Sequence, residues 1–371
     1  MKKRIAHLTS AHPRHDIRIL LKECASLAKA GFEVFMVVAD GAGDEEKVGV
    51  QLLDLGHRGG RWSRFFIMPW KVWAKARKLN ADIYQFHDPE LLIVGLLLRL
   101  EGFRVIYDSH EDLPRQIYSK HYIPLWLRNV ISFCVEIFEN FVSRRLIAVV
   151  TATPHIGKRF SHINRTVVVV NNYPLEQEIV AKSLRKRDPK QICYTGGITR
   201  VRGALEMVRA LQGLDVKLVM AGPMENQQLK SELESTPGWE NVCYLGSVER
   251  ARVFEVMETS SLGFLLYHPE PNHTDAQPNK LFEYMAVGLP VLASHFDLWR
   301  SIVEGYDAGV CVDPQNVDEI RKGLLKILES EKNIENMGER GRNAVEAHLN
   351  WGSEEKKLVQ LYQSILERGV R

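Results

Sequence analysis

Short apolar segments alternate with helical segments along the whole chain, and this alternation constrains the fold more than any other feature. Each apolar segment is bounded by glycine, proline or polar residues, which is typical of strands. Because the segments are apolar throughout, helices are expected to cover both faces of the sheets they form. We therefore predict an α/β fold with doubly wound parallel sheets. In the first half, the expected strands occupy residues 4–10, 32–40, 81–88, 103–107, 146–153 and 166–172.

A polar segment divides the chain into two similar halves. Residues 171–190 are charged near an Asp-Pro pair, and the pattern of strands and helices restarts after them. A length of 371 residues also favours two domains. We expect a Rossmann-like N-terminal domain over 1–170, a linker over 171–190, a Rossmann-like domain over 191–350, and a terminal helix over 351–371 that crosses back to the first domain. Doubly wound sheets bind ligands at the carboxyl ends of their strands, so facing domains would share a cleft there.

Composition excludes several classes of protein. Apolar residues make up 45% of the chain and charged residues 26%, the balance of a globular protein. The longest apolar run, residues 91–98, is far too short to span a bilayer, and the N-terminus lacks the apolar stretch of a secretory signal. The five cysteines are scattered without CxxC spacing, so we expect reduced, buried thiols in a cytoplasmic protein.

The first half carries an excess of basic residues and one basic, aromatic segment. Residues 1–170 contain 25 lysines and arginines against 17 acidic residues, which indicates an anionic partner. Residues 61–79 contain six basic residues and no acidic one. They form either an ordinary helix whose rings face the core or a helix that lies in a membrane interface. No nucleic-acid-binding motif accompanies them, so no nucleic-acid partner is expected. The rings concerned are Trp62, Phe65, Phe66, Trp70 and Trp73, followed later by Tyr118, Tyr122 and Trp126.

The most informative stretch follows an expected strand over residues 261–269. A polar loop leads to a helix that starts near Pro278, since proline suits the first helical position. The backbone amides of Asn279, Lys280 and Leu281 would then form a phosphate site at the positive end of the helix dipole. Two carboxylates stand eight residues apart across this stretch and suit the hydroxyls of ribose and hexose; the alternative is that both are solvated. They are Asp275 and Glu283.

Two glycines and two arginines follow the first strand of the second half. Gly196 and Gly197 allow a ligand to approach the backbone closely. Arg200 and Arg202, at the opening of the next helix, suit a diphosphate. The segment is neither a GxGxxG fingerprint nor a Walker sequence. A simple turn with solvated charges is the alternative.

Two histidines stand beside acids at strand ends in the first half. His110 lies within an Asp-Ser-His-Glu-Asp sequence after the strand at 103–107, and His87 precedes Asp88. Either can hydrogen-bond a phosphate or a sugar hydroxyl, or transfer a proton, and either can be purely structural. The chain has no HExxH motif, cysteine cluster or Asp-x-Asp pair, so no metal or cofactor is expected.

Taken together, these stretches resemble the family 4 glycosyltransferases, which are retaining enzymes of the two-domain GT-B fold, here of the bacterial surface-polysaccharide type. The resemblance covers nearly the whole chain, and its most specific part is similar to the family's paired-acid segment, E-x7-E. The segments that carry it are HPRHDIRILLKECASLAKAGFEV, VIYDSHEDLPRQI, TGGITRVRG, DAQPNKLFEYMAVGLPVLAS and WGSEEKKLVQLYQSIL.

The resemblance implies a role for each site residue. Glu283 would bind the nucleotide ribose, Asp275 the hydroxyls of the donor sugar, and the amides of residues 279–281 the diphosphate. His110 would lie beside the anomeric centre, and Arg202 stands where the family usually has lysine. The family's usual glutamate is Asp275 here, and its usual arginine is Gly197, a charge that Arg200 would replace. The opening loop also lacks the family's Gly-Gly pair, so its acceptor-side contacts would come from His12, Arg14, Asp16 and Arg18.

The resemblance implies that the protein is a retaining glycosyltransferase. It would move a sugar from a UDP- or GDP-sugar donor to a lipid-linked saccharide acceptor in surface-polysaccharide or lipopolysaccharide assembly, at the inner face of the membrane. Two alternatives stay open: a nucleotide-sugar 2-epimerase of GT-B fold, which needs no acceptor, and a two-lobed binding protein without catalytic activity.

Overall fold

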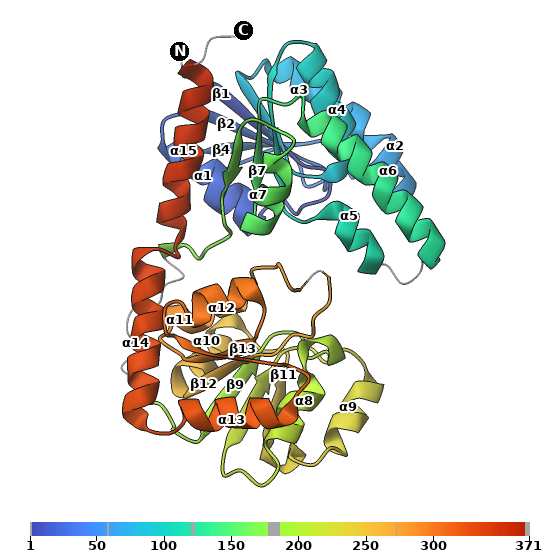
Figure 1. The fold of residues 1–371 in the computed structure, drawn as a ribbon. Helices are drawn as coiled ribbons and strands as arrows, with labels where there is room; N and C mark the ends of the chain where they lie inside the picture. Colours follow the sequence, from blue (N-terminus) through green and yellow to red (C-terminus); the bar gives the residue numbers. More distant parts are fainter. Residues whose placement is uncertain (1, 58, 120–122, 177–185, 272, 368–371) are drawn as a thin grey trace. The chain divides into compact units, whose positions relative to one another are not determined.

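The computed structural model describes the chain except for residues 1, 58, 120–122, 177–185, 272 and 368–371. It divides into two compact units, residues 1–172 with 351–371, and residues 173–350 (Figure 1). The boundary falls at the start of the predicted linker, part of which lies outside the described residues. Each unit is a mainly parallel sheet with helices packed on it, which confirms the predicted fold class.

The first unit has an eight-stranded sheet in the order β3-β4-β2-β1-β5-β6-β7-β8. All neighbours are parallel except β3 and β4. The order reverses between β1 and β5, and such a switch point is where doubly wound sheets bind ligands. The strands are β1 (Arg4–Leu8), β2 (Glu33–Val38), β3 (Glu45–Lys47), β4 (Val50–Asp54), β5 (Ile83–Phe86), β6 (Arg104–Ser109), β7 (Ala148–Thr151) and β8 (Val167–Val169).

Helices of the first unit follow the predicted pattern with two differences. The expected helix over 17–30 begins as a π-helix, and the expected helix over 61–79 divides before Met68, near the proline at 69. The helices are η1 (Ile17–Cys24), α1 (Ala25–Lys29), α2 (Arg61–Phe66), α3 (Met68–Leu79), η2 (Pro89–Leu91), α4 (Leu92–Leu100), α5 (Leu113–Gln116), η3 (Ile117–Ser119), α6 (Leu125–Ser143), α7 (Pro154–Ser161) and α15 (Trp351–Glu367).

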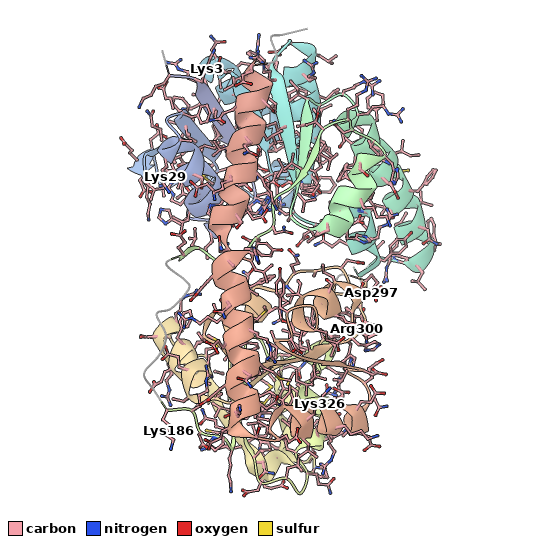
Figure 2. The ribbon with its side chains drawn as sticks, turned by 60° about the vertical axis from the view of Figure 1, so that its left-hand side comes forward. Lys3, Lys29, Lys186, Asp297, Arg300 and Lys326 are labelled. Atoms are coloured by element: carbon pink, nitrogen blue, oxygen red, sulfur yellow. The ribbon has the colours of Figure 1, made fainter. Side chains whose placement is uncertain are left out.

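The terminal helix α15 belongs to the first unit. Its first residue, Trp351, is buried and donates its indole N–H to the Ser26 hydroxyl at 2.9 Å. Lys29, labelled in Figure 2, lies 3.6 Å from the Glu355 carboxylate of α15. Figure 1 shows α15 beside α1. The last segment of the chain therefore completes the unit that the first segment begins.

The second unit has a six-stranded parallel sheet in the order β11-β10-β9-β12-β13-β14, with its switch point between β9 and β12. The strands are β9 (Gln191–Thr195), β10 (Lys217–Ala221), β11 (Val242–Gly246), β12 (Leu262–Leu265), β13 (Val291–Ser294) and β14 (Gly309–Val312). The helices are η5 (Arg200–Arg202), α8 (Ala204–Ala210), α9 (Gln227–Glu234), η6 (Trp239–Asn241), α10 (Arg250–Thr259), α11 (Asn279–Ala286), α12 (Asp297–Val303), α13 (Val317–Ile327) and α14 (Glu331–Ala347).

Alternate residues of the second sheet enter different halves of the core. Cys193 packs in the cluster with Trp299, whereas its neighbours Ile192 and Tyr194 pack in a second cluster with Phe264. Because both faces of the central strands are buried, their residues are apolar without alternation. This explains why the strands were recognisable from the sequence. Burial also raises the pKa of the Cys193 thiol to about 12, so this cysteine stays an uncharged core residue.

Candidate active site

Asp88 lies at the switch point of the first unit, where the strand order reverses between β1 and β5. It follows β5, and its carboxylate is almost fully buried beside the loop that follows β1. It accepts hydrogen bonds from the Thr9 hydroxyl at 2.8 Å and from the Ser10 and Ala11 amides at 2.5 and 3.0 Å. The His12 Nδ1 atom lies 2.7 Å from its other oxygen. One carboxylate therefore holds the first part of the opening loop, from Thr9 to His12.

The same carboxylate sets the charge of His12. Burial opposes ionisation of both groups, but their mutual hydrogen bond raises the pKa of His12 and lowers that of Asp88. His12 keeps 28% of its side chain exposed, and its ring lies 5.0 Å from the ring of His110. Thus His12, predicted on the acceptor side, and His110, predicted beside the anomeric centre, lie next to each other at this switch point.

A second buried carboxylate, Asp108 at the end of β6, holds both predicted strand-end histidines. Its Oδ2 atom lies 2.8 Å from His110 Nε2 and 3.0 Å from His87 Nδ1. Buried Arg18 donates from Nη2 to Oδ1 at 3.0 Å. Burial opposes the charge on Asp108, but Arg18 and His110 lower its pKa well below the ordinary value, so it stays ionised. His87 is different, because burial lowers its pKa to about 4 and keeps its ring neutral.

Among the described residues, two groups could hold a metal ion. One consists of His87, Asp108 and His110, whose ligand atoms lie within 4.8 Å of one another, and the other of His7, Glu23 and His87. In the first group, both imidazoles already hydrogen-bond the Asp108 carboxylate, whose charge Arg18 balances. These residues therefore form a hydrogen-bonded network among themselves.

The other three residues predicted on the acceptor side have structural partners. Arg14 forms an ion pair with Asp40, where it lowers the pKa of that carboxyl to about 2. Asp16 caps η1 by accepting the Ile19 amide at 2.9 Å. Arg18 is buried against Asp108. Arg14 and Asp16 lie in the loop after β1 and Arg18 lies in η1, and each of the three has a partner within the first unit.

In the second unit, a glycine turn lies against two cations. Gly196 and Gly197 follow β9, and a methyl group on Gly196 would lie 3.7 Å from Lys280 Cε and 3.9 Å from Arg202 Nη1. Arg202 also donates to the Gly197 carbonyl at 3.4 Å. Gly203 has a φ of +73°, and a methyl group there would meet the Leu266 carbonyl oxygen at 2.2 Å. Only glycine at this position lets the start of α8 approach the end of β12 so closely.

Glu283 lies on α11 beside the same cations. Its carboxylate accepts a hydrogen bond from Lys280 Nζ at 2.7 Å, and Arg250 Nη1 lies 3.8 Å away. The Glu283 side chain is only 15% exposed. Arg250 is the first residue of α10, the helix after β11, and was not predicted as a site residue. The signal was a basic residue shortly after the carboxyl end of a strand.

Arg200 is placed differently from Arg202. It forms a bidentate ion pair with Glu232 of α9, and its amide donates to Glu225 at 3.0 Å. We predicted that Arg200 supplies the positive charge that the family usually carries at the position of Gly197. In the structure, the Arg200 guanidinium is paired with the Glu232 carboxylate. Arg202 and Lys280 are the cations that the fold brings to the glycine turn.

The loop before α11 is held by Trp299, whose indole donates to the Ala276 carbonyl at 2.7 Å. Next to it, Asp275 is half-buried and accepts the Thr274 hydroxyl at 3.2 Å. Pro278 is the N-cap of α11, one residue before the first helical position predicted for it, and its carbonyl accepts the Leu281 amide at 3.0 Å. Of the three amides predicted to hold a phosphate, that of Leu281 is therefore already engaged.

Three residues after β12 were not selected from the sequence. His268 lies 3.3 Å from the Glu206 carboxylate, and His273 hydrogen-bonds the His268 carbonyl at 3.2 Å and contacts the Tyr267 ring. Burial lowers the pKa of His273. The histidine pair in the segment HPEPNHTD was the available signal.

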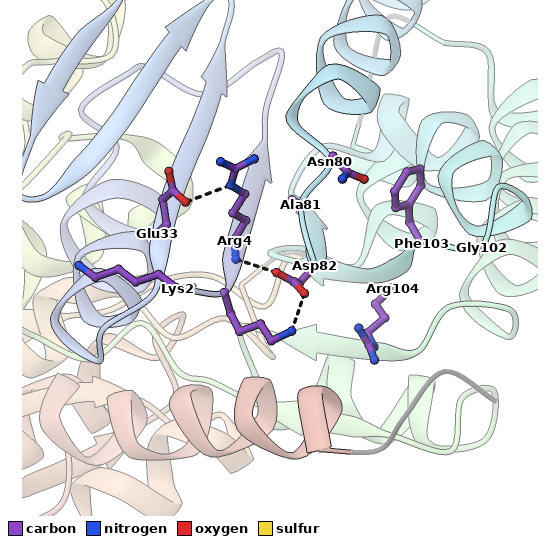
Figure 3. Close-up of a pocket in the computed structure, with 10 residues that line it drawn as sticks. Lys2, Arg4, Glu33, Asn80, Ala81, Asp82, Gly102, Phe103 and Arg104 are labelled. Atoms are coloured by element: carbon purple, nitrogen blue, oxygen red, sulfur yellow. Dashed lines mark hydrogen bonds and ion pairs between the residues drawn. The ribbon is translucent and has the colours of Figure 1, made fainter.

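A pocket of about 750 Å³ lies at the amino ends of strands in the first sheet, at the opposite end of these strands from Asp88 and Asp108 (Figure 3). It is lined by the amino ends of β1 and β6, including Arg4 and Arg104. Its charges are largely paired, since Asp82 accepts from Lys3 and Glu33 pairs with Arg4. Sheets of this type bind ligands at the carboxyl ends of strands. This pocket is therefore separate from the candidate site.

Comparison with known proteins assigns both units to one class. Residues 18–172 match the family model "Glycosyl transferase 4-like domain", and residues 176–344 match the model "Glycosyl transferases group 1". An uncharacterized glycosyltransferase of Methanocaldococcus jannaschii is 22% identical over 187 residues, which are 48% of this chain and 45% of that protein. The matched part spans about half the length of this relative.

Solved structures share the fold over the whole chain. Sucrose-phosphate synthase of Thermosynechococcus elongatus has a TM-score of 0.79 at 16% identity, covering 99% of this chain and 100% of that one. HepE of Anabaena in complex with UDP has 0.73 at 12%, covering 98% and 100%. WaaG, a glycosyltransferase involved in lipopolysaccharide biosynthesis, has 0.68 at 15%, covering 95% and 98%.

Proposed function

We propose that this chain, which belongs to the glycosyltransferases of GT-B fold, moves a sugar from a nucleoside diphosphate to a lipid-linked saccharide with retention of anomeric configuration. The observation that carries the proposal is the group of Arg202, Lys280 and Glu283 around the glycine turn at the switch point of the second unit. A UDP complex of the structurally similar HepE supports a nucleotide donor.

The chemistry of this group suits a diphosphate leaving group. Negative charge develops on the leaving diphosphate in the transition state, and fixed cations beside it lower the barrier. Arg202 can donate two parallel hydrogen bonds, and Lys280 adds a compact charge. Glu283 accepts hydrogen bonds, which suits the two hydroxyls of ribose. Asp275 would hold the hydroxyls of the donor sugar.

The first unit supplies the reacting side in this proposal. His110 would lie beside the anomeric carbon, oriented by Asp108. In a front-face displacement, the bond from the anomeric carbon to the phosphate oxygen breaks while the acceptor oxygen attacks the same face. The departing phosphate oxygen takes the acceptor proton. A trapped covalent glycosyl–protein adduct that turns over at the catalytic rate would contradict this route.

Helix α6 supports a lipid-linked acceptor, because its exposed face is apolar. Trp126 and Phe133 are 70% and 64% exposed, whereas the buried face carries Arg128, Ser132 and Glu139. This is the reverse of an ordinary surface helix, and large exposed apolar faces mark contact sites. The exposed apolar residues are Leu125, Trp126, Val130, Phe133, Ile137, Phe138 and Phe141.

Helices α2 and α3 also expose large apolar side chains, and their sequence carries six basic residues. Trp62 is 79% exposed, and Phe65, Phe66 and Trp70 are also exposed. The alternative prediction, an ordinary helix whose rings face the core, is therefore wrong for these four residues. Trp73 is the exception, since it is half-buried and donates to Glu101 at 3.1 Å. Basic residues beside exposed tryptophans suit the interface of an anionic bilayer.

Cys134 also lies exposed on α6, contrary to the expected burial of the thiols.

None of the described helices is long and apolar enough to cross a bilayer. We therefore propose peripheral contact with the inner membrane face, through the apolar faces of α2 and α6, where a lipid-linked saccharide is held. The similarity to WaaG supports a role in surface-polysaccharide assembly.

Calorimetry with UDP, GDP and ADP tests the donor site. We expect one diphosphate to bind, and to lose affinity in Glu283→Ala. Binding of none would contradict the proposal. Product formed from the nucleotide sugar alone would instead indicate the 2-epimerase considered above.

Cosedimentation with vesicles tests the surface. Vesicles with 30% anionic lipid, roughly, should retain wild type and a Leu325→Ala control, since Leu325 is an exposed apolar residue of the second unit. The variant Trp62→Ala/Trp70→Ala/Phe133→Ala should stay in solution. Equal retention of all three proteins would remove the membrane role of this surface.

A further inference from the structure

The pocket at the amino ends of β1 and β6 carries more positive than negative charge. Its volume of about 750 Å³ lies within the range of small-molecule sites. Four of its lining residues are basic and two are acidic, an excess of two positive charges. Three of the basic residues come from the start of the chain, which the proposed function does not involve. The four are Lys2, Lys3, Arg4 and Arg104 (Figure 3).

Both acidic residues of the pocket are already engaged by neighbouring donors. The Glu33 carboxylate accepts from Arg4 Nε at 3.0 Å. Asp82 accepts from Lys3 Nζ through Oδ1 at 3.0 Å and from the backbone N–H of Arg4 through Oδ2 at 2.9 Å. Burial opposes the charge of Asp82, but these two hydrogen bonds lower its pKa, so the carboxylate is ionised. Lys3 and Arg4 therefore each have an acidic partner.

Arg104, the first residue of β6, lacks such a partner. Its Nε atom is buried and has no hydrogen-bond partner among the described residues. Figure 3 shows interactions of Lys3 and Arg4 with acidic residues of the pocket, but none that joins Arg104 to another residue drawn there. Asp82 lies close enough to feel the charge of Arg104, yet both of its oxygens already accept hydrogen bonds. A buried donor without an acceptor is costly, so Arg104 needs an acceptor from outside the chain.

A phosphate group suits this cation better than other ligand groups do. A guanidinium can hold two phosphate oxygens with parallel hydrogen bonds. A phosphate monoester carries roughly two negative charges at pH 7, which matches the excess of positive charge in the lining. A carboxylate would neutralise only half of that excess. The Phe103 ring and the Asn80 amide add uncharged walls that the rest of a ligand can contact.

We propose that this pocket binds a small molecule that carries a phosphate monoester, with Arg104 as its main contact. Lys2 adds a second, exposed positive charge. Strand β6 begins at Arg104 and ends at Ser109, directly after Asp108. The pocket and the candidate active site therefore lie at opposite ends of the same strand, and the phosphate ligand is separate from the sugar donor and acceptor. The inference does not depend on the proposed function.

Nitrogen-15 NMR of the full-length protein, labelled on arginine and phenylalanine, tests the site. Methyl phosphate is the probe, at about pH 6.5, where a phosphate monoester is largely a dianion. The Arg104 Nε–H signal is assigned by its absence in Arg104→Lys. We expect this signal to move with rising methyl phosphate and to reach a plateau, at an ionic strength held constant with sodium chloride. A signal that stays in place, or that moves equally with sodium chloride alone, would overturn the proposal.

Two variants with opposite expected effects separate binding from folding, and the backbone amide of Phe103 reports on both. Arg104→Gln removes the charge but keeps a side-chain donor, and it should weaken methyl phosphate binding about 10-fold or more. Asp82→Asn removes a neighbouring negative charge and should strengthen binding about 3- to 10-fold, a gain that an unfolded protein cannot give. Unchanged affinity in either variant would contradict the proposal. Arg144→Gln, an exposed position of the same unit outside the pocket, is the matched control and should bind like wild type.

Two further comparisons test the class of ligand and the independence of the site. Acetate should bind about 10-fold more weakly than methyl phosphate, because it brings one negative charge instead of roughly two. Equal affinity would contradict a phosphate ligand. Arg202→Ala should leave the Phe103 response as in wild type, whereas its loss would show that the signal reports on the candidate donor site. Absence of sugar transfer in wild type would contradict the proposed function and leave the result for Arg104 standing.

Discussion

Arg202 lies over the ring of Tyr267, with its guanidinium carbon 5.2 Å from the ring centroid, while its Nη1 atom donates to the Gly197 carbonyl. The ring and the glycine turn therefore hold the guanidinium in place before any ligand binds. A preorganised cation loses little side-chain entropy on binding a diphosphate. Arg200, two residues earlier, is held instead by Glu232.

This difference predicts opposite outcomes for two neighbouring arginines. Arg202→Ala should weaken binding of the preferred nucleoside diphosphate about 10- to 100-fold, the range for hydrogen bonds to charged groups. Arg200→Ala should change it less than about 3-fold. Calorimetry measures both. A larger loss in Arg200→Ala would mean that Arg200 leaves Glu232 when the donor binds.

Glu283 should contribute to recognition of the nucleoside but not of the phosphates. Glu283→Gln should weaken nucleoside diphosphate binding about 10-fold, because the ribose hydroxyls lose a charged acceptor. Affinity for inorganic diphosphate should stay the same or rise, since the variant removes a negative charge next to Lys280. Equal losses for both ligands would show that Glu283 acts by placing Lys280 rather than by touching ribose.

His110 should affect turnover and not donor affinity, because it lies in the other unit from Arg202 and Lys280. His110→Ala should lower kcat about 100- to 1000-fold, within the range for a positioned acid, base or hydrogen-bond donor. Its nucleoside diphosphate affinity should match wild type. His162→Ala, at an exposed position of the same unit, is the control and should keep full activity. Loss of donor affinity in His110→Ala would contradict the assigned role.

Glu23 should make stability depend on pH in a defined direction. Its folded-state pKa lies above the ordinary 4.5, so its contribution is present below pH 4.5 and is lost as pH rises through the folded-state pKa. Glu23→Gln lacks this loss. The free energy of unfolding of the variant, relative to wild type, should therefore rise by up to about 1.4 kcal/mol per pH unit above pH 4.5. Urea titrations from pH 4.5 to 8 measure it, and a falling difference would mean that Glu23 is ionised in the fold.

Two glycines with similar backbone angles should respond differently to alanine. Gly203 and Gly213 have φ of +73° and +70°, but a methyl group meets the Leu266 carbonyl only at Gly203. Gly213→Ala should cost about 1 kcal/mol from backbone strain alone. Gly203→Ala should cost about 2–4 kcal/mol, because overpacking adds to the strain. Equal shifts in thermal unfolding would show that the β12 segment moves aside at little cost.

Much of the fold was predictable because its strands are buried on both faces. Ile192, Cys193 and Tyr194 are all buried, so the run is apolar whichever way each side chain points. Strand β3 escaped prediction because it is a three-residue antiparallel edge strand, Glu45–Lys47, and its neighbour β4, which pairs in parallel with β2, is only partly buried. Edge strands carry little of the apolar pattern on which prediction depends.

The sequence by itself determined the strands other than β3 and β4, the helix that begins after Pro278, and the loops that carry His12, His110 and the Gly196–Gly197 turn. These follow from local rules of apolar pattern, proline geometry and glycine backbone freedom. The residue pattern also singled out Glu283 and Arg202, and the resemblance to a family gave each of them a role.

Only the tertiary structure decided which charged side chains in those loops are available. Arg18 and Arg202 are both arginines in a short helix that follows the first strand of a unit. Arg18 is nevertheless buried against Asp108, while Arg202 contacts the glycine turn. Likewise, Tyr362 lies 355 positions after His7, and packing of the last helix on the first strand's unit brings them together. The role of a charged group depends on which partners surround it, and those partners come from distant segments that no local pattern contains.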